Sequence, residues 1–186
     1  MIDNDPPNTR PDRPRAGGWL RIAIIGRNPK VTLARIVIVV VACIVVFKLV
    51  LLPVRIEGVS MLPAYKDKSL NFINRLAYLR RQPRRGDVVG IRLGGTNVFY
   101  RAPGVMYMKR IVGLPGETVA FADGHLLING TALDEPYVKG RCDWNRAPVT
   151  VGPSQYFVVG DNRSMPRDDH VFGRAEKEQI VGKVLF

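Results

Sequence analysis

Residues 31–52 read VTLARIVIVVVACIVVFKLVLL, and this apolar run decides how the chain is organised. Its 22 residues would form a helix about 33 Å long at roughly 1.5 Å per residue, enough to cross a hydrocarbon core of about 30 Å. Arg35 and Lys48 lie within about a turn of the two ends, where long side chains can reach the polar interface. The run therefore predicts a transmembrane helix.

A cleaved signal peptide and a buried strand are the alternatives for this run. Signal peptides have an apolar core of about 7 to 15 residues followed by a small-x-small site, and no such site precedes Pro53. A buried strand covers about 4 to 8 residues. Because the run is longer than either, a retained helix is favoured.

Residues 1–30 form a basic tail before the run. Residues 1–18 contain Pro, Asp, Asn and Arg with almost nothing apolar, which predicts disorder, and residues 19–25 are a candidate interfacial stretch. The Lys and Arg residues before the span or near its start are Arg10, Arg13, Arg15, Arg21, Arg27, Lys30 and Arg35. By the positive-inside rule, the tail is expected in the cytoplasm and residues 53–186 on the outer face of the membrane.

Residues 53–186 have the pattern of a β domain. Short apolar or alternating stretches recur between Gly, Pro and Asp, and the dipeptide Asn129-Gly130 is typical of a hairpin turn. The predicted strands are Leu70–Asn74, Asp87–Leu93, Val105–Val112, Thr118–Ala122, His125–Ile128, Gln155–Val159 and Ile180–Leu185. The expected fold is mainly β, with antiparallel, partly barrel-like sheets after one N-terminal transmembrane helix.

The net charge of +12 is compatible with two kinds of anionic partner, nucleic acids and membranes. Residues 66–85 concentrate this charge, with seven Lys and Arg against Asp67 alone. A solvated loop is the plain interpretation, but the nearby span favours contact with phospholipid head groups. No nucleic-acid-binding fold motif, zinc-ligand spacing or aromatic stacking pattern accompanies these residues, so nucleic acid is not expected as a partner.

Ser60, within EGVSMLPA at residues 57–64, is the candidate nucleophile. A serine hydroxyl is nearly inert at neutral pH and needs a base, and neither histidine of the chain stands in a recognisable Ser-His-Asp context. Lys109, in a predicted strand, is the better partner. It must be neutral, and lowering its pKa from about 10.4 to roughly 8 would cost about 3 kcal/mol. Arg110 should point to the other face, where Asp161 is expected to pair with it as a structural residue.

Four separated blocks agree with this pairing. They are GVSMLP at 58–63, RGDVV at 85–89, YMKRIVGLPGE at 107–117 and YFVVGDNR at 156–163, the last continuing to FG at 172–173. Singly, Ser60 could be a turn residue and Lys109 a surface lysine. Together and in this order after a span, the blocks resemble the bacterial type I signal peptidases, membrane-bound serine endopeptidases with a Ser-Lys dyad.

The resemblance implies a role for each matching residue. Ser60 would be the nucleophile, Lys109 the general base, and the backbone N–H of Ser60 an oxyanion donor. Gly58 replaces a serine that adds a second donor in many members. The residues implied to line shallow pockets for small side chains are Ile56, Met61, Tyr65 and Tyr107. The implied substrates are signal-peptide-bearing preproteins at the bacterial cytoplasmic membrane, bound as an added strand, without metal or cofactor.

The last block departs from the family pattern. The usual continuation Ser-x-Asp-Ser-Arg is here residues 166–170, PRDDH, which keeps Asp168 but lacks the serine that commonly orients the lysine. Three possibilities follow: Ser164 or water orients Lys109, His170 tunes the site, or the enzyme is slow or specialised. Eukaryotic-type relatives use a histidine base, but the intact lysine block argues against that role for His170.

Two further functions remain open. One is a specialised peptidase of the same superfamily that matures pilins or conjugation proteins, and the other is an inactive membrane-tethered binding protein. The altered segment 164–170 motivates the second. The chain is expected to act as a monomer, and Cys43 and Cys142 are too widely separated in the sequence to suggest a disulfide.

Overall fold

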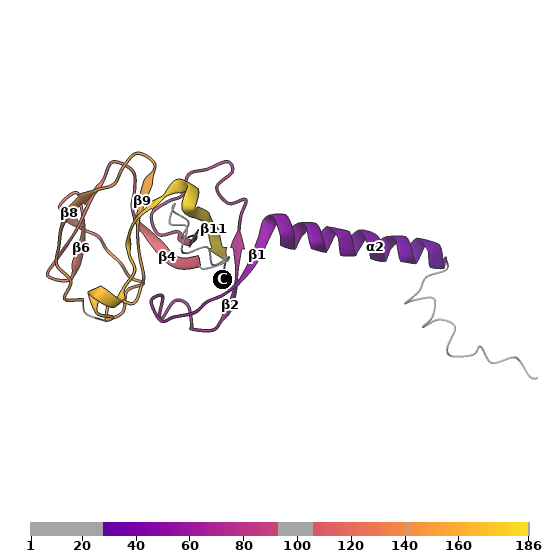
Figure 1. The fold of residues 1–186 in the computed structure, drawn as a ribbon, viewed down its shortest axis with the longest axis horizontal. Coiled ribbons are helices and arrows are strands. Elements are labelled where there is room, and N and C mark those ends of the chain that lie inside the picture. The colour runs from indigo at the N-terminus through magenta and orange to yellow at the C-terminus, as the bar shows by residue number, and fades with distance from the viewer. Residues whose placement is uncertain (1–27, 93–105, 141, 186) are drawn as a thin grey trace, which may run out of the picture. The chain divides into compact units, whose positions relative to one another are not determined.

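The computed structural model describes residues 28–92, 106–140 and 142–185, which fall into two compact units (Figure 1). The first unit ends at Val45 and the second begins at Val46. The predicted disorder of residues 1–18 and the predicted interfacial stretch 19–25 lie outside the described residues.

The apolar run is helical, with α2 (Pro29–Val45) in α-helical and η1 (Val46–Val50) in π-helical conformation. This helix is long and apolar enough to cross a membrane, and none of its residues is buried by the protein. It ends before the predicted Leu52, because Leu51 and Leu52 pair in a strand. Pro53, which has no amide hydrogen, could not continue the helix.

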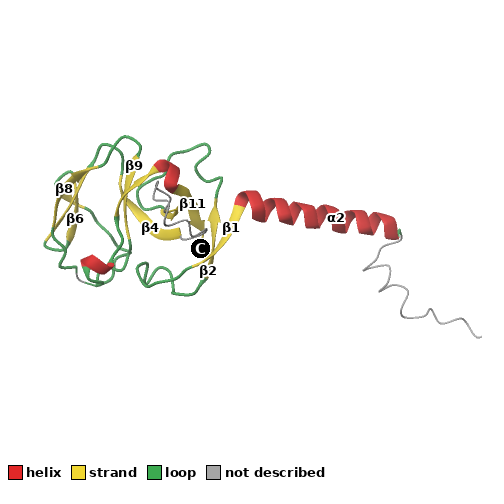
Figure 2. Cartoon of the chain, in the orientation of Figure 1, coloured by secondary structure: helices red, strands yellow, loops and turns green. Residues whose placement is uncertain are grey.

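The described residues of the second unit form two antiparallel sheets, drawn as yellow arrows in Figure 2. The strands are β1 (Leu51–Arg55), β2 (Leu70–Asn74), β3 (Val88–Arg92), β4 (Met106–Gly113), β5 (Thr118–Ala122), β6 (His125–Ile128), β7 (Thr131–Ala132), β8 (Arg146–Thr150), β9 (Gln155–Val159), β10 (Gly173–Glu176) and β11 (Ile180–Leu185). The seven-stranded sheet has the order β1-β2-β11-β3-β4-β9-β10, and the four-stranded sheet has the order β7-β6-β5-β8. Neither sheet closes into a barrel within the described residues.

The mainly β, antiparallel prediction is confirmed, and β2, β5, β6, β9 and β11 have the predicted bounds. The predicted strands at β3 and β4 were each placed within one residue of the observed ends, while Leu93 and Val105 lie outside the described residues. Strands β1, β7, β8 and β10 were missed. β8 has the sequence RAPVT and is largely exposed, so it lacks the alternation that marks a half-buried strand.

Strand β4 lies inside the seven-stranded sheet, between β3 and β9. Its residue Ile111 has no solvent exposure, and the same holds for Val89 on β3 and Val159 on β9. Two short 3₁₀ turns, η2 (Arg167–Asp169) and η3 (Lys177–Gln179), flank β10. Strand β4 pairs with β3 over Met106–Arg110 and with β9 from Arg110 onward, and Lys109 lies next to the point where both pairings meet.

Candidate active site

Ser60 lies in the turn that follows β1. The turn is closed by the amide of Leu62, which donates to the carbonyl of Val59 at 3.1 Å. Asn162, which follows β9, anchors this turn. Its amide donates to the Ser60 carbonyl at 3.0 Å, and its side-chain nitrogen donates to the Val59 carbonyl at 3.0 Å. The backbone of the candidate nucleophile is therefore anchored to the Gly-Asp-Asn-Arg block, a function of Asn162 that the sequence analysis did not identify.

Lys109 reaches Ser60 from β4. Its Nζ lies 2.7 Å from Ser60 Oγ, and its side chain is only 3% exposed. Burial lowers the pKa of Lys109 from 10.5 to about 8, although the Asp161 carboxylate acts in the opposite direction. The hydrogen bond expected between the two side chains is present. A lysine with this pKa can give up its proton near neutral pH and then accept one from the serine.

Arg110 points away from the dyad, as strand alternation predicts. Its Nε and Nη2 donate to the two carboxylate oxygens of Asp161 at 2.8 and 2.5 Å, and its Nη1 donates to the Gly86 carbonyl at 2.8 Å. Its guanidinium also lies 4.0 Å from the ring centre of Tyr137. Because Asp161 has no solvent exposure, this paired arrangement is needed to hold its charge in the core. The predicted Asp161–Arg110 pairing is confirmed.

The two predicted oxyanion residues have different surroundings. The Gly58 amide donates to Asp67 Oδ1 at 2.8 Å, so it is already engaged. Gly58 has φ +110°, a conformation that disfavours a serine there although a β-carbon would meet no atom within 4 Å. The Ser60 amide has no hydrogen-bond partner among the described residues. Only the Ser60 amide therefore keeps a donor for an incoming carbonyl oxygen.

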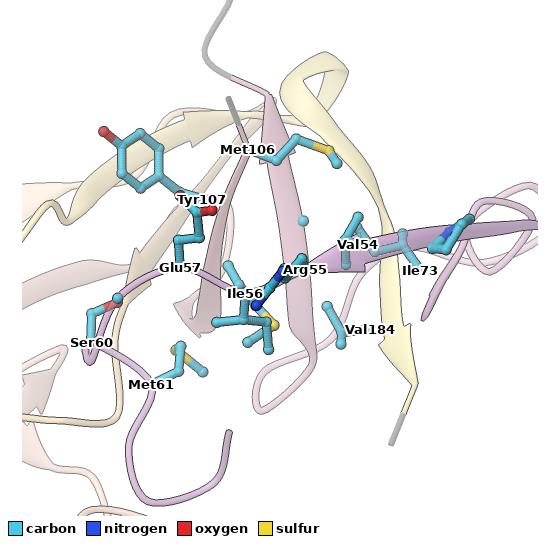
Figure 3. Close-up of a pocket in the computed structure, with 14 residues that line it drawn as sticks. Val54, Arg55, Ile56, Glu57, Ser60, Met61, Ile73, Met106, Tyr107 and Val184 are labelled. Carbon is cyan, nitrogen blue, oxygen red and sulfur yellow. The ribbon is translucent and has the colours of Figure 1, made fainter. Parts of the chain in front are cut away.

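A cavity of about 530 Å³, lined mainly by apolar residues, extends from Ser60 (Figure 3). In the close-up, Ser60 lies at one end of the cavity and Val184 toward the other. The lining residues are Pro53, Val54, Arg55, Ile56, Glu57, Gly58, Ser60, Met61, Ile73, Gly90, Met106, Tyr107, Met108 and Val184. Three of the four residues predicted to line a pocket, Ile56, Met61 and Tyr107, are thus at the cavity.

Tyr65 is the exception, because it does not line this cavity, and its pocket role stays a prediction. It is 3% exposed and packs in the core with Ile56 and Met61 rather than on the cavity wall. The Tyr65 amide donates to the Met61 carbonyl at 2.9 Å, which closes a turn after Ser60. Burial raises the pKa of Tyr65 to about 12.

Ser164 and Asp168 do not reach Lys109. The Ser164 hydroxyl donates to Asn162 Oδ1 at 2.6 Å, so Ser164 does not replace the missing orienting serine. Asp168 is exposed in the turn η2 and has no side-chain partner among the described residues. Among all the residues that the structure describes, Ser60 is the only hydrogen-bond partner of the Lys109 ammonium.

His170 is buried, 4% exposed, with its ring centre 4.9 Å from that of Trp144. A β-carbon at Gly160 would lie 2.2 Å from the Ser60 carbonyl oxygen and 2.6 Å from His170 Nε2, so all three groups meet closely behind the nucleophile. Burial lowers the pKa of His170 to about 4, with Lys109 and then Arg163 acting in the same direction. The imidazole is therefore neutral at pH 7.

No three His, Cys, Asp or Glu side chains gather closely enough to bind a metal within the described ranges. The absence of a cofactor remains a prediction. Glu135 is a residue that the sequence did not point to: it holds the buried Arg163 through two hydrogen bonds of 3.0 and 2.6 Å, beside the block that fixes Ser60. The Glu135 carboxylate and the Arg163 guanidinium are both nearly buried, so this ion pair stabilises the segment that contains Asn162.

Comparison with known proteins identifies one family for this chain. The family model described as "Signal peptidase, peptidase S26" matches residues 30–186. Signal peptidase I of Bacillus caldolyticus is 36% identical over 145 residues, covering 70% of this chain and 75% of that protein. Signal peptidase I of Leptolyngbya laminosa is 31% identical over 139 residues, and the chain spans 64% of its length.

A solved structure of a signal peptidase I from Enterococcus faecalis V583 is 29% identical and has a TM-score of 0.43. It covers 56% of this chain, and 98% of the solved chain is matched. With a family match over most of its length and a relative above one third identical, the chain belongs to the signal peptidase family, peptidase S26.

Proposed function

We propose that this protein is a membrane-bound serine endopeptidase that removes N-terminal signal peptides from exported preproteins. The observation that supports this most directly is the 2.7 Å contact between Ser60 Oγ and the Nζ of the buried Lys109, beside an apolar cavity. Family membership supports the substrate class.

Acylation begins when neutral Lys109 takes the proton of the Ser60 hydroxyl. The Ser60 oxygen then forms a bond with the carbonyl carbon of the scissile peptide, and the carbonyl oxygen becomes an oxyanion. The Ser60 amide donates a hydrogen bond to that oxyanion, and such a donor is typically worth several kcal/mol in the transition state. The protonated lysine returns its proton to the leaving nitrogen, the C–N bond breaks, and the mature amino terminus departs.

Deacylation uses the same base. A water molecule gives its proton to Lys109 and its oxygen bonds to the acyl carbon. Collapse of the second tetrahedral intermediate breaks the bond to Ser60 Oγ, which regains the proton from the lysine. The signal peptide then leaves with a free carboxylate, and the enzyme returns to its starting state.

Substrate binding follows from the free edge of β4. Strand β9 pairs with β4 only from Arg110 onward, so residues 106–108 have β3 on one side and no described strand on the other. These three residues line the cavity together with residues 53–58. An extended peptide can add to this edge by main-chain hydrogen bonds, with small apolar side chains directed into the cavity.

We further propose that residues 29–50 anchor the protein in the bacterial cytoplasmic membrane, that residues 1–28 lie in the cytoplasm and that the catalytic domain, a monomer, acts on the outer face. The exposed apolar helix supports the anchoring. The excess of Lys and Arg before it supports the orientation. Phospholipids are then direct partners of the span.

The test is cleavage of an Ala-x-Ala preprotein by Ser60→Ala and Lys109→Ala variants of the full chain. Each should lose cleavage while circular dichroism remains that of the wild type, and exposed Ser154→Ala should cleave normally. Full cleavage by either dyad variant would refute the mechanism. Labelling of Ser60 by a mechanism-based acylating inhibitor would exclude the inactive binding protein. Cleavage of pilin precursors but not of secretory ones would favour the specialised peptidase.

A further inference from the structure

The turn between β2 and β3 presents apolar and basic side chains to solvent. We call residues 75–84 the basic turn. Leu76 is 43% exposed and Leu79 is 73% exposed. Neither leucine lines the cavity beside Ser60 or the one beside Arg163. Arg80 and Arg84 are also exposed, and their side chains have no partner among the described residues. Exposed leucines next to unpaired arginines suit a partner that is both apolar and anionic.

The leucines face outward because the other side of the turn is fixed. The Tyr78 hydroxyl donates to Asp87 Oδ2 at 3.1 Å, and the ring packs against the core. Arg81 Nε donates to the Ala77 carbonyl at 3.2 Å, and an Arg81 nitrogen lies 3.6 Å from Asp87. These inward contacts leave Leu79 directed away from the core in a defined conformation.

The basic turn begins at the end of the helical run. The Arg75 amide donates to the Val50 carbonyl at 2.9 Å, and Arg75 Nη1 donates to the Lys48 carbonyl at 3.0 Å. One residue further back, the ring of Phe47 lies 6.2 Å from that of Phe72 on β2. The last residues of the run therefore hold the start of the turn, and both belong to the same compact unit.

We propose that the basic turn binds the anionic surface of the bilayer that holds the span. Leu76 and Leu79 enter the interface, while Arg80 and Arg84 pair with lipid phosphates. This proposal rests on the proposed membrane anchoring but not on the peptidase chemistry. It explains why apolar side chains are exposed beside the carbonyls of Lys48 and Val50, where the chain leaves the hydrocarbon region.

The proposal is confined to one end of β2. Leu51 is paired with Asn74, next to the basic turn, whereas Arg55 is paired with Leu70 at the other end of the strand. Four residues of strand separate the ends by about 13 Å, which exceeds a Debye length of about 8 Å at physiological ionic strength. Lys66, Lys68 and Leu70, all exposed, thus form a matched comparison with the same residue chemistry.

The experiment measures lipid contact at single cysteines in the full chain. One version keeps natural Cys43 in the helix and carries Cys142→Ala. Two others carry Leu79→Cys or Leu70→Cys with both natural cysteines changed to alanine. Each is nitroxide-labelled and reconstituted in phosphatidylglycerol or phosphatidylcholine vesicles, and paramagnetic resonance compares collisions with lipid-soluble oxygen and with a water-soluble nickel chelate.

We expect the label at position 79 to be lipid-protected in phosphatidylglycerol and the label at position 70 to be accessible to the chelate. Since each basic residue near an anionic surface changes the binding constant roughly fivefold, Arg80→Gln with Arg84→Gln should lower the ratio of bound to free turn by about thirtyfold. Lys66→Gln with Lys68→Gln should leave it unchanged. Cleavage of a detergent-solubilised preprotein should be unaffected by the arginine changes.

The position-43 label separates the two proposals. If it is embedded in lipid while the label at position 79 is as accessible to the chelate as that at position 70, the surface proposal is refuted and the anchoring stands. Equal protection at position 79 in neutral vesicles, unaffected by loss of Arg80 and Arg84, would refute recognition of anionic lipid. If the position-43 label is in water, anchoring fails and the surface proposal fails with it.

Discussion

Replacing Lys109 by Met should abolish cleavage and at the same time stabilise the domain. Moving the lysine pKa from 10.5 to about 8 corresponds to roughly 3 kcal/mol at neutral pH, at about 1.36 kcal/mol per pH unit. Met has nearly the same shape without the charge. The substitution removes the hydrogen bond to Ser60, which contributes about 1 kcal/mol. The half-buried Ser60 hydroxyl can bond to water instead. The free energy of unfolding should therefore rise by about 2 kcal/mol at pH 7.

The gain from Lys109→Met must depend on pH in one direction. Below pH 8 the amine is protonated in both the folded and the unfolded chain, so the full penalty of burying it is present. Between about pH 8 and 10.5 the unfolded chain binds a proton that the folded chain does not, so the stability of the wild type rises with pH. The advantage of the variant should shrink over this window and disappear above it.

Urea unfolding of the full chain in mild detergent, followed by the fluorescence of buried Trp144, measures the difference. Arg110→Met is the matched control, since it also removes a cation from β4. It leaves Asp161 buried without its partner, so it should lower the free energy of unfolding by about 3–5 kcal/mol. A Lys109→Met variant that is less stable than the wild type at pH 7, or a gain that persists at pH 10.5, would refute the view that burial lowers the lysine pKa.

Three other outcomes can be measured directly. The kcat/KM for preprotein cleavage should rise about tenfold per pH unit up to a pH near 8 and then level off, because only neutral Lys109 acts as base; a flat profile from pH 6 to 9 would contradict this. Gly58→Ser should lower the free energy of unfolding by about 1–2 kcal/mol in urea titrations without raising activity, because φ is +110°. Gly113→Ala should cost at least about 1–3 kcal/mol by the same assay, because a β-carbon would lie 2.6 Å from Val119 Cγ2 and 2.8 Å from Phe157 Cβ.

Local sequence signals were sufficient where the structure depends on neighbouring residues. Strands β5 and β6 were predicted with their observed bounds, because each is a short, largely apolar stretch that ends at a turn dipeptide. Asn129 and Gly130 have φ of 51° and 81°, as a tight hairpin turn requires. The apolar helix was predicted from the length and composition of residues 31–52, and its end was misplaced because Leu51 and Leu52 pair with β2.

Some short-range hydrogen bonds could not be read from the sequence, although their partners are close in the chain. The family resemblance implied a pocket position for Tyr65, but its amide bonds to the Met61 carbonyl and its side chain packs in the core. Ser164 looked suitable to replace the missing orienting hydroxyl, yet it bonds to Asn162. The Asp67 carboxylate captures the Gly58 amide from nine residues away. No pattern in the sequence marks which groups form these hydrogen bonds.

The two departures from the family pattern, Pro166 and His170, change the surroundings of Lys109 without removing what lowers its pKa. Pro166 offers no hydroxyl, so Ser60 is the one hydrogen-bond partner of the ammonium in the described residues. A permanently charged arginine in place of buried His170 would need its own partner and would repel both Lys109 and Arg163, the cations that already lower the histidine pKa. A neutral imidazole avoids that repulsion while filling the space behind the Ser60 carbonyl. The proposed base, Lys109, is therefore positioned by the packing of β4 and by one serine, and its proton affinity is lowered chiefly by exclusion of water.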